Sequence, residues 1–419
     1  MKYIDLLFCL FIYSSNICAV NVNARAVKHV ALPILLLAIG VAQHDQQAQE
    51  LFDVIKKNLS FTQQFSVDVH YADKVVYSKW QKQYPIIIVI EPKEDLLTWK
   101  LFDVTQKKVI NQGEIKKREH QRAYAHIVAD ILWQELTGSP GFFSTRIAYC
   151  KEVKGPKERT LKHICIADYD GMYEQVLVDT PTVNIAPRWN ADLRRPLLFY
   201  SEFTDKNVCM MYVDMKKRRH IACNFDGVNM LPAFSQDGTK AVFCASQGKG
   251  NPQLFYIQQG KVKQLTKNSG NNFCPTLNES GDIIYFCSDC NLKRPSIFTY
   301  DMKLNRLDRI ANTASSESPC YCPQNKKLAY CRSIKGVMQI CIYDTVAKKH
   351  QQLTFDNAAK QGVSWSPCGN YLVFVHEIAN TSCLCMMNIP TRKIYYLSKK
   401  GAKISYPVWS PRYVQYPVI

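Results

Sequence analysis

The sequence predicts an α/β N-terminal domain followed by an all-β six-bladed propeller. A three-residue pattern ending in an aromatic residue or leucine recurs with steps of 45, 43, 44, 44 and 44 residues. Its six copies start at Pro187, Pro232, Pro275, Pro319, Val363 and Pro407. The first 140 residues lack this period and alternate between helical and strand patterns. A fixed period of this size is typical of propellers and solenoids, and four short strands per period favour the propeller.

Each repeat begins with a hairpin. In "PAFSQDGTKAVFCAS", Asp237-Gly238 lies between two apolar runs, and both residue types tolerate the positive φ of a tight turn. A third run ("PQLFYIQ") and a fourth ("QLT" at Gln264) complete this unit. Because β-branched and aromatic residues alternate throughout, a helical solenoid fits poorly.

The last copy of the pattern predicts how the ring closes. Only ten residues follow Trp409, so the partners of this strand must lie upstream. The runs Thr145–Cys150, His163–Asp168 and Glu174–Val178 read as its second, third and fourth strands. We therefore expect five complete blades and a sixth blade that both ends of the domain share, which leaves no open edge.

The expected domains are a signal peptide at 1–19, an α/β domain at 20–140 and the propeller at 141–419. We expect strands at 30–37, 85–90, 97–104 and 108–116, and helices at 46–60, 73–80 and 120–136. The Gly/Pro/Ser-rich stretch "TGSPGFFS" separates the two domains. Lys2 followed by the apolar run Leu6–Tyr13 is typical of an export signal, with cleavage after Ala19. No later run reaches 18 apolar residues, so we expect no membrane span in the mature chain.

Cysteine and charge exclude some functions and leave others open. Of 17 cysteines, 15 remain after the expected cleavage, and their positions in apolar runs indicate small buried hydrophobic residues. Cys287-x-x-Cys290 and Cys320-x-Cys322 could suggest zinc, but no second Cys-x-x-Cys lies at zinc-ribbon spacing, so we expect no metal or cofactor. The net charge is +18, but Lys and Arg are scattered and no nucleic-acid-binding module is present. A cationic protein that binds an envelope polymer remains an alternative.

An enzyme of the prolyl-oligopeptidase type needs a Gly-x-Ser-x-Gly elbow, which is absent. We expect a protein that is not an enzyme. A thiol-dependent hydrolase, with one cysteine paired to a histidine, stays a less favoured alternative.

Three sequence features resemble a known family. The junction "LTGSPGFFSTRIAYC" (Leu136–Cys150) and the segment "IADYDGMYEQVLV" (Ile166–Val178) are similar to those of the TolB family, the periplasmic propeller proteins of the Tol–Pal system. The "P-x-W-S-P-x-G" and "Q-L-T" elements match its blades. The resemblance covers Val30 to Pro411. It implies a monomeric, non-enzymatic periplasmic scaffold that binds the outer-membrane lipoprotein Pal and contacts TolA and other inner-membrane Tol proteins. That role supports envelope integrity and outer-membrane constriction during division.

The resemblance and the repeat together predict where partners bind. Loops that lead into the innermost strands and loops that join second to third strands share one face of a propeller, which we call the rim. Its candidate partner-binding residues are Asn184, Asp205, Asn229, Lys249, Asn272, Asp289, Arg294, Glu317, Arg332, Gln361, Glu377 and Ser405. The candidate TolA-binding extension contains Val20, Asn21, Val22, Asn23 and Arg25. The opposite face carries the hairpin turns, and we expect it to serve closure rather than recognition.

Overall fold

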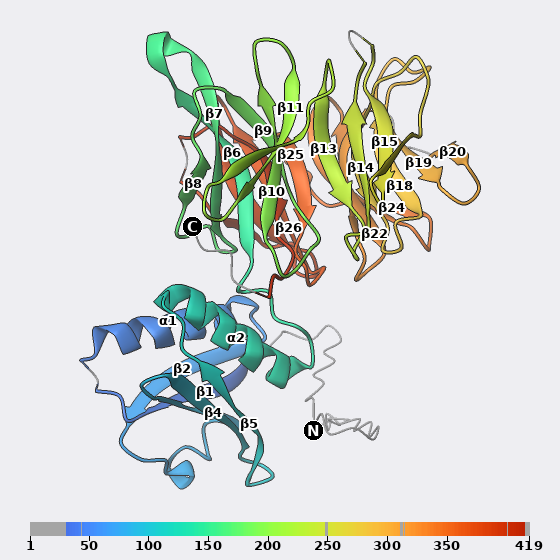
Figure 1. Cartoon of the computed structure of the whole chain (residues 1–419). Coiled ribbons are helices and arrows are strands. Elements are labelled where there is room, and N and C mark those ends of the chain that lie inside the picture. The colour runs from blue at the N-terminus through green and yellow to red at the C-terminus, as the bar shows by residue number, and fades with distance from the viewer. Residues whose placement is uncertain are drawn as a thin grey trace. The chain divides into compact units, whose positions relative to one another are not determined.

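The structure is a computed structural model that describes residues 31–414 except 43, 248, 249, 311, 312, 314 and 400. The chain divides into two compact units between Gly141 and Phe142 (Figure 1). The expected signal peptide and the candidate extension at 20–25 lie outside the described residues.

The N-terminal unit is a mixed five-stranded sheet in the order β2-β1-β3-β4-β5, with two helices. Its elements are β1 (Leu32–Ile39), α1 (Gln46–Phe61), β2 (Phe65–Ala72), η1 (Tyr77–Lys79), β3 (Ile86–Pro92), β4 (Leu96–Asp103), β5 (Lys108–Lys116) and α2 (Gln121–Thr137). Strand β1 pairs in parallel with β2 and β3, and the other pairs are antiparallel. This order confirms the predicted α/β class.

Local signals explain where the helices begin and end. The Asp45 carboxylate accepts hydrogen bonds from the amides of Gln47 and Ala48 at 3.0 and 3.1 Å, which caps α1. Gly138, with φ of 67°, ends α2 in a left-handed conformation. Between the helices, the buried Asn58 side chain bonds Nδ1 of His126 at 2.9 Å.

Two expectations for this unit are wrong. Strand β2 was missed, although its apolar residues Phe65, Val67 and Val69 alternate with polar ones, as in a half-buried strand. The helix expected at 73–80 is only the single 3₁₀ turn η1. None of its three residues is fully buried, although Tyr77 packs in part against the sheet, and a helix this short is marginal without more extensive packing.

The second unit is the predicted six-bladed propeller. The first blade contains β9 (Val183–Trp189), β10 (Leu197–Phe203), β11 (Val208–Asp214) and β12 (Arg219–Cys223). The second contains β13 (Asn229–Phe234), β14 (Lys240–Ala245), β15 (Gln253–Gln258) and β16 (Lys261–Gln264). The third contains β17 (Asn272–Leu277), β18 (Ile283–Ser288), β19 (Ser296–Asp301) and β20 (Arg306–Arg309). The fourth contains β21 (Ser316–Cys322), β22 (Lys327–Ile334), β23 (Val337–Asp344) and β24 (Lys349–Gln352). The fifth contains β25 (Lys360–Trp365), β26 (Tyr371–Ile378), β27 (Thr381–Asn388) and β28 (Ile394–Tyr396).

The sixth blade is shared by both ends of the unit, as predicted. It contains β29 (Ile404–Trp409), β6 (Arg146–Lys154), β7 (Thr160–Asp168) and β8 (Gln175–Val178), with the 3₁₀ turn η2 (Pro156–Glu158) between β6 and β7. The Trp409 indole nitrogen donates to Thr145 Oγ1 at 2.7 Å, and the Ser410 amide donates to the Arg146 carbonyl at 2.8 Å. These bonds join segments more than 260 residues apart in the sequence, so the ring closes through buried hydrogen bonds.

Cysteines contribute to the apolar cores of the propeller. All 15 cysteines among the described residues are free thiols, and ten of them are buried. Cys150, Cys244, Cys287 and Cys331 occupy equivalent positions on the second strands of four blades and have no exposed surface. They act as small hydrophobic residues, as the sequence indicates.

Candidate functional site

The six innermost strands surround a central channel, and each strand carries a β-bulge at the same position. The bulged residues are Ala186, Leu231, Cys274, Ser318, Gly362 and Tyr406, all with φ between 53° and 56°. A left-handed backbone costs a residue other than glycine about 1 kcal/mol or more. Five of the six residues are not glycine and so carry this strain, and β-bulges are over-represented next to functional sites. We use the bulges to divide the channel into two parts: a rim side, before the bulges in each strand, and a turn side, after them.

Three of the predicted rim residues are buried rather than exposed. Asn184, Asn229 and Asn272 have no exposed surface, and each is at or near the start of an innermost strand. Each side-chain amide donates to the residue four positions earlier: to Thr180 Oγ1 at 2.9 Å, to the Phe225 carbonyl at 2.7 Å and to Asn268 Oδ1 at 3.0 Å. These asparagines hold the loops in shape, so their side chains are not available to a partner.

A buried lysine has the same role in the fifth blade. Lys360, with no exposed surface, pairs with the carboxylate of Asp356 four residues earlier and donates to the Ala358 carbonyl at 2.6 Å. Four blades thus clamp the loop before the innermost strand through its first residues. The sequence does not indicate that these residues are buried clamps, because asparagine and lysine side chains in loops more often face solvent.

Three other predicted residues, Glu317, Gln361 and Ser405, lie on the innermost strands just before the bulges and are half-buried. Burial raises the pKa of Glu317, and the nearby carboxylate of Glu377 raises it further. The structure therefore brings together two predicted acids from neighbouring blades. Their repulsion favours a cationic group on this side of the channel.

Three of the remaining predicted residues lie on the loops that join second to third strands: Asp205, Asp289 and Arg294. The prediction was wrong for Arg332 and Glu377, which lie on the second strands β22 and β26 because these strands extend further than their apolar runs. Asp205 and Arg294 are exposed, whereas Asp289 is half-buried and accepts the amide of Asn271 at 2.6 Å. Arg332 is half-buried on β22 opposite Ser316. Lys249 lies outside the described residues.

The sequence reasoning missed one loop of the rim. The connection between β6 and β7 belongs to the same face, because β6 ends beside the start of β29: the Glu152 amide donates to the Lys403 carbonyl at 2.9 Å. Lys403 also pairs with the Glu152 carboxylate at 3.2 Å. The shared blade was recognised in the sequence, so this loop could have been included by the same rule as the other five.

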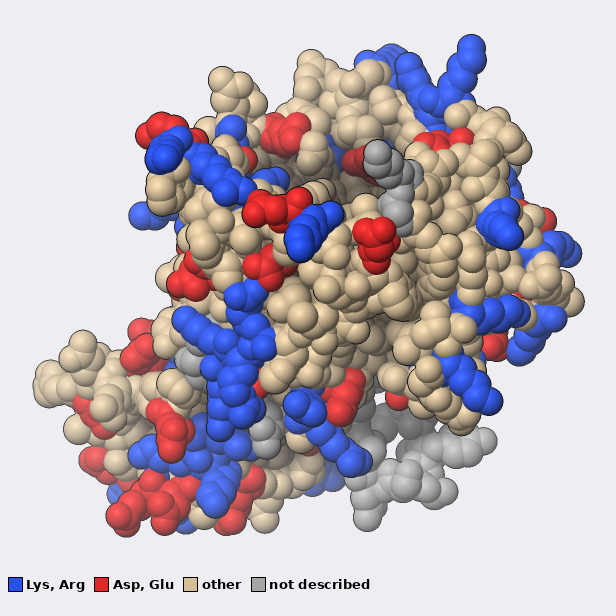
Figure 2. All heavy atoms as spheres, turned by 45° about the horizontal axis from the view of Figure 1, so that its top comes forward, with Lys and Arg blue, Asp and Glu red and all other residues tan. Residues whose placement is uncertain are grey.

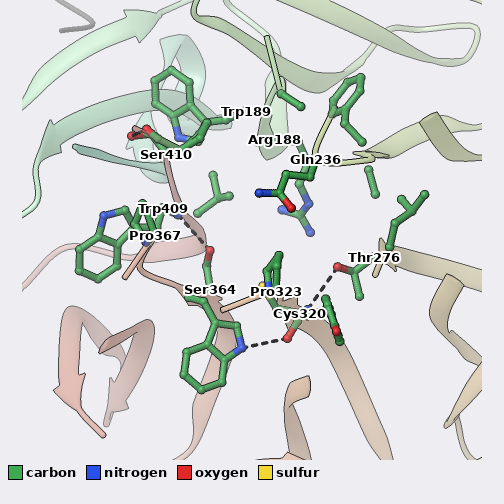
Figure 3. A pocket seen from close by; sticks show the side chains of 18 of the residues that line it. Arg188, Trp189, Gln236, Thr276, Cys320, Pro323, Ser364, Pro367, Trp409 and Ser410 are labelled. Atoms are coloured by element: carbon green, nitrogen blue, oxygen red, sulfur yellow. Dashed lines mark hydrogen bonds between the residues drawn. The ribbon is translucent and has the colours of Figure 1, made fainter. Parts of the chain in front are cut away.

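A cavity of about 410 Å³ lies on the turn side of the channel, entirely within the propeller unit. It is lined by four of the six bulge residues and by the ends of the innermost strands, including Trp189, Trp365, Trp409 and several prolines. Figure 3 shows Arg188 and Gln236 entering it from one side, with Thr276, Cys320 and Ser364 facing them. The sequence assigned this face to closure alone, and nothing in the hairpin turns themselves indicates the cavity.

The described residues offer little support for metal or thiol chemistry. They contain no group of three or more His, Cys, Asp or Glu side chains placed to hold a metal ion. Burial raises the pKa of Cys150 and Cys322 to about 12 and that of Cys274 to about 11. A nucleophilic cysteine needs a lowered pKa, and these three thiols have the opposite shift.

Comparisons with known proteins agree with this architecture. A family described as "TolB beta propeller domain" matches residues 133–413. The Tol-Pal system protein TolB of Ruthia magnifica is 23% identical over 91% of this chain and 92% of its own length. The TolB of Gluconobacter oxydans is 29% identical over 36% of this chain and 33% of its own length.

The crystal structure of TolB from Acinetobacter baumannii matches with a TM-score of 0.76 and 24% identity, covering 91% of this chain and 97% of that one. No helix among the described residues is long and apolar enough to cross a membrane. The family match spans more than half of the sequence, and the fold agrees over both units. The chain therefore belongs to the TolB family, the non-enzymatic propeller proteins of the Tol–Pal system.

Proposed function

We propose that this chain is a periplasmic scaffold that binds a Pal-like peptidoglycan-associated lipoprotein at the rim of its propeller. The construction of the rim supports this most strongly. Buried clamps at Asn184, Asn229, Asn272 and Lys360 hold the loops in shape, and exposed polar side chains lie between them. Loops held on a rigid scaffold commonly carry recognition.

The second proposed contact is with TolA and other Tol proteins, through the extension that contains Val20, Asn21, Val22, Asn23 and Arg25. Binding at both sites by a monomer would link the outer-membrane lipoprotein to inner-membrane proteins. This link supports envelope integrity and outer-membrane constriction during division. Deleting residues 20–25 should abolish TolA binding and leave Pal binding unchanged.

The described geometry narrows the proposed Pal contacts to side chains that reach the surface. Asp205 and Arg294 are exposed, and Glu377 is half-buried beside Glu317. The buried asparagines serve the site by shaping it. Their substitution should lower stability as well as affinity, which makes them poor probes of contact.

The test is calorimetric titration with the soluble domain of the Pal-like lipoprotein from the same organism. The combined variant Asp205→Asn, Arg294→Gln and Glu377→Gln should raise Kd more than tenfold, a loss of about 1.4 kcal/mol. The control is Lys216→Gln with Lys217→Gln, because both lysines are exposed in a turn on the other face. Arg218 and Arg219 are left unchanged, since they bond Asp214, Tyr200 and Glu202 within the first blade. Binding that survives the rim variant but fails in the control would assign the partner to the opposite face.

The dependence of binding on salt concentration distinguishes this proposal from the alternative, a cationic protein that binds an envelope polymer. Figure 2 brings the upper end of the propeller in Figure 1 forward. It shows acidic as well as basic side chains at that end, rather than one continuous basic surface. Docking of a folded partner should therefore depend weakly on ionic strength, whereas binding to an anionic polymer should weaken steeply as salt rises.

A further inference from the structure

The turn-side cavity is surrounded by six equivalent side chains, of which only one is charged. They are the middle residues of the repeated triplets: Arg188, Ala233, Thr276, Cys320, Ser364 and Val408. The five others are small, so the long side chain of Arg188 has room to extend toward the channel axis, as Figure 3 shows. Arg188 also influences the ionisation of Cys274, Cys320 and Tyr406, which lie on three other blades.

Arg188 has no acidic partner within the described part of the chain. Its Nη1 donates to the carbonyl of its neighbour Pro187 at 2.8 Å, and no carboxylate pairs with the guanidinium there. The described residues that line the cavity include a second arginine, Arg412, but no Asp or Glu. Glu317 lies on β21 and Glu377 on β26, and both are on the rim side of the bulges.

An unpaired charge in a partly buried cavity is costly unless water or a counter-charge meets it. With one N–H occupied, the guanidinium still has a free edge that fits the two oxygens of a carboxylate. The rest of the wall combines tryptophan, tyrosine and proline residues, which pack well against apolar peptide groups, with polar residues such as Gln236, Asn278 and Ser364. A volume of about 410 Å³ also lies within the roughly 300–1,000 Å³ of small-ligand pockets.

We propose that the turn-side cavity is a second binding site, which takes an acidic peptide segment whose carboxylate pairs with Arg188 while adjacent apolar residues contact the aromatic and proline wall. The site is separate from the rim and does not depend on the proposed binding of Pal there. It gives the propeller two recognition surfaces at opposite ends of one channel.

The test uses two labelled probe peptides, acetyl-Pro-Phe-Glu-Ala-amide and the same peptide with Gln in place of Glu. Fluorescence anisotropy measures their binding to the full chain. We expect the Glu peptide to bind at least about tenfold more tightly than the Gln peptide, because Gln cannot form the charge-assisted pair with the guanidinium that a carboxylate forms. Arg188→Gln should remove this preference, and Arg188→Lys, which keeps the charge but loses the planar fork, should retain part of it.

The matched control is Arg194→Gln, which removes the same charge from an exposed turn on the same face and lies outside the cavity. It should change the affinity less than twofold. Ala233→Leu fills the cavity beside Arg188 without changing charge, and it should weaken binding even if Arg188→Gln folds poorly. Each variant's thermal transition is measured in parallel, to confirm that it is folded.

Three results would overturn the proposal. One is a wild-type protein that does not bind the Glu peptide, or binds both peptides equally. A second is binding within twofold of wild type in both Arg188→Gln and Ala233→Leu. The third comes from competition: inorganic phosphate displacing the probe at concentrations where acetate does not would assign the cavity to phosphate ligands instead.

Discussion

Trp409 lets us test how much one buried hydrogen bond contributes to closing the propeller. Its indole, 4% exposed, donates to Thr145 Oγ1 at 2.7 Å and so ties β29 to the chain just before β6. Trp189 occupies the equivalent position in the first blade, but its indole nitrogen is buried with no hydrogen-bond partner among the described residues. Trp409→Phe and Trp189→Phe therefore remove similar packing but different polar interactions.

The expected difference follows from these two environments. Trp409→Phe loses a net hydrogen bond of about 0.5–1.5 kcal/mol, and it leaves no unpaired hydroxyl because Thr145 still donates to the Phe142 carbonyl at 2.6 Å. Trp189→Phe instead removes a buried unpaired donor, which relieves about 1–3 kcal/mol of desolvation. The Trp409 variant should be less stable than the Trp189 variant by about 2 kcal/mol or more. For a unit of this size that is a Tm difference of about 4–8 °C.

Scanning calorimetry of the full chain measures the propeller transition in each variant. Trp365→Phe is a second control: its indole donates to the Cys320 carbonyl at 3.0 Å, between two neighbouring blades that are not the closing pair. It should lower stability without increasing proteolysis at the junction before β6, whereas Trp409→Phe should do both. Equal Tm values for the Trp409 and Trp189 variants, or the reverse order, would refute this account of closure.

Three further predictions concern the ring, the thiols and the pH dependence. Truncation before Pro407 removes the second half of β29 and exposes part of the edge of β6, so limited proteolysis should become faster; a fragment as resistant as the full chain would contradict the closure scheme. Titration under denaturing, non-reducing conditions should find nearly all 15 thiols of the described residues free, and fewer than three would exclude the proposed role of cysteines as buried hydrophobic residues. The raised pKa of Glu317 means that its contribution to stability falls as pH rises above the ordinary value of 4.5, so Glu317→Gln should gain stability over wild type at neutral pH. Glu279→Gln is the opposite control, since the Tyr321 hydroxyl lowers the pKa of Glu279, and both variants shifting in the same direction would contradict this reading.

The sequence by itself was enough to predict the propeller, its six blades and the shared closing blade. These features depend on a repeat of about 44 residues and on turn signals such as Asp237-Gly238. At such a turn the residue type itself decides the backbone conformation: Gly238 has a φ of 70°, which glycine adopts readily. Strand β2 could also have been found from alternation alone. The sequence also predicted buried cysteines correctly, because their apolar context is local.

Only the tertiary structure decided which polar residues reach a surface. Asn184, Asn229 and Asn272 look like exposed loop residues in the sequence, yet the hydrogen bonds that bury them depend on how each loop folds back. The position of Arg188 depends on the bulge before it, which sets the face to which the following residues of the strand point. The triplet pattern contained this arginine, but only the assembled ring placed it among five small side chains beside a cavity, because the neighbours of a channel residue come from other blades.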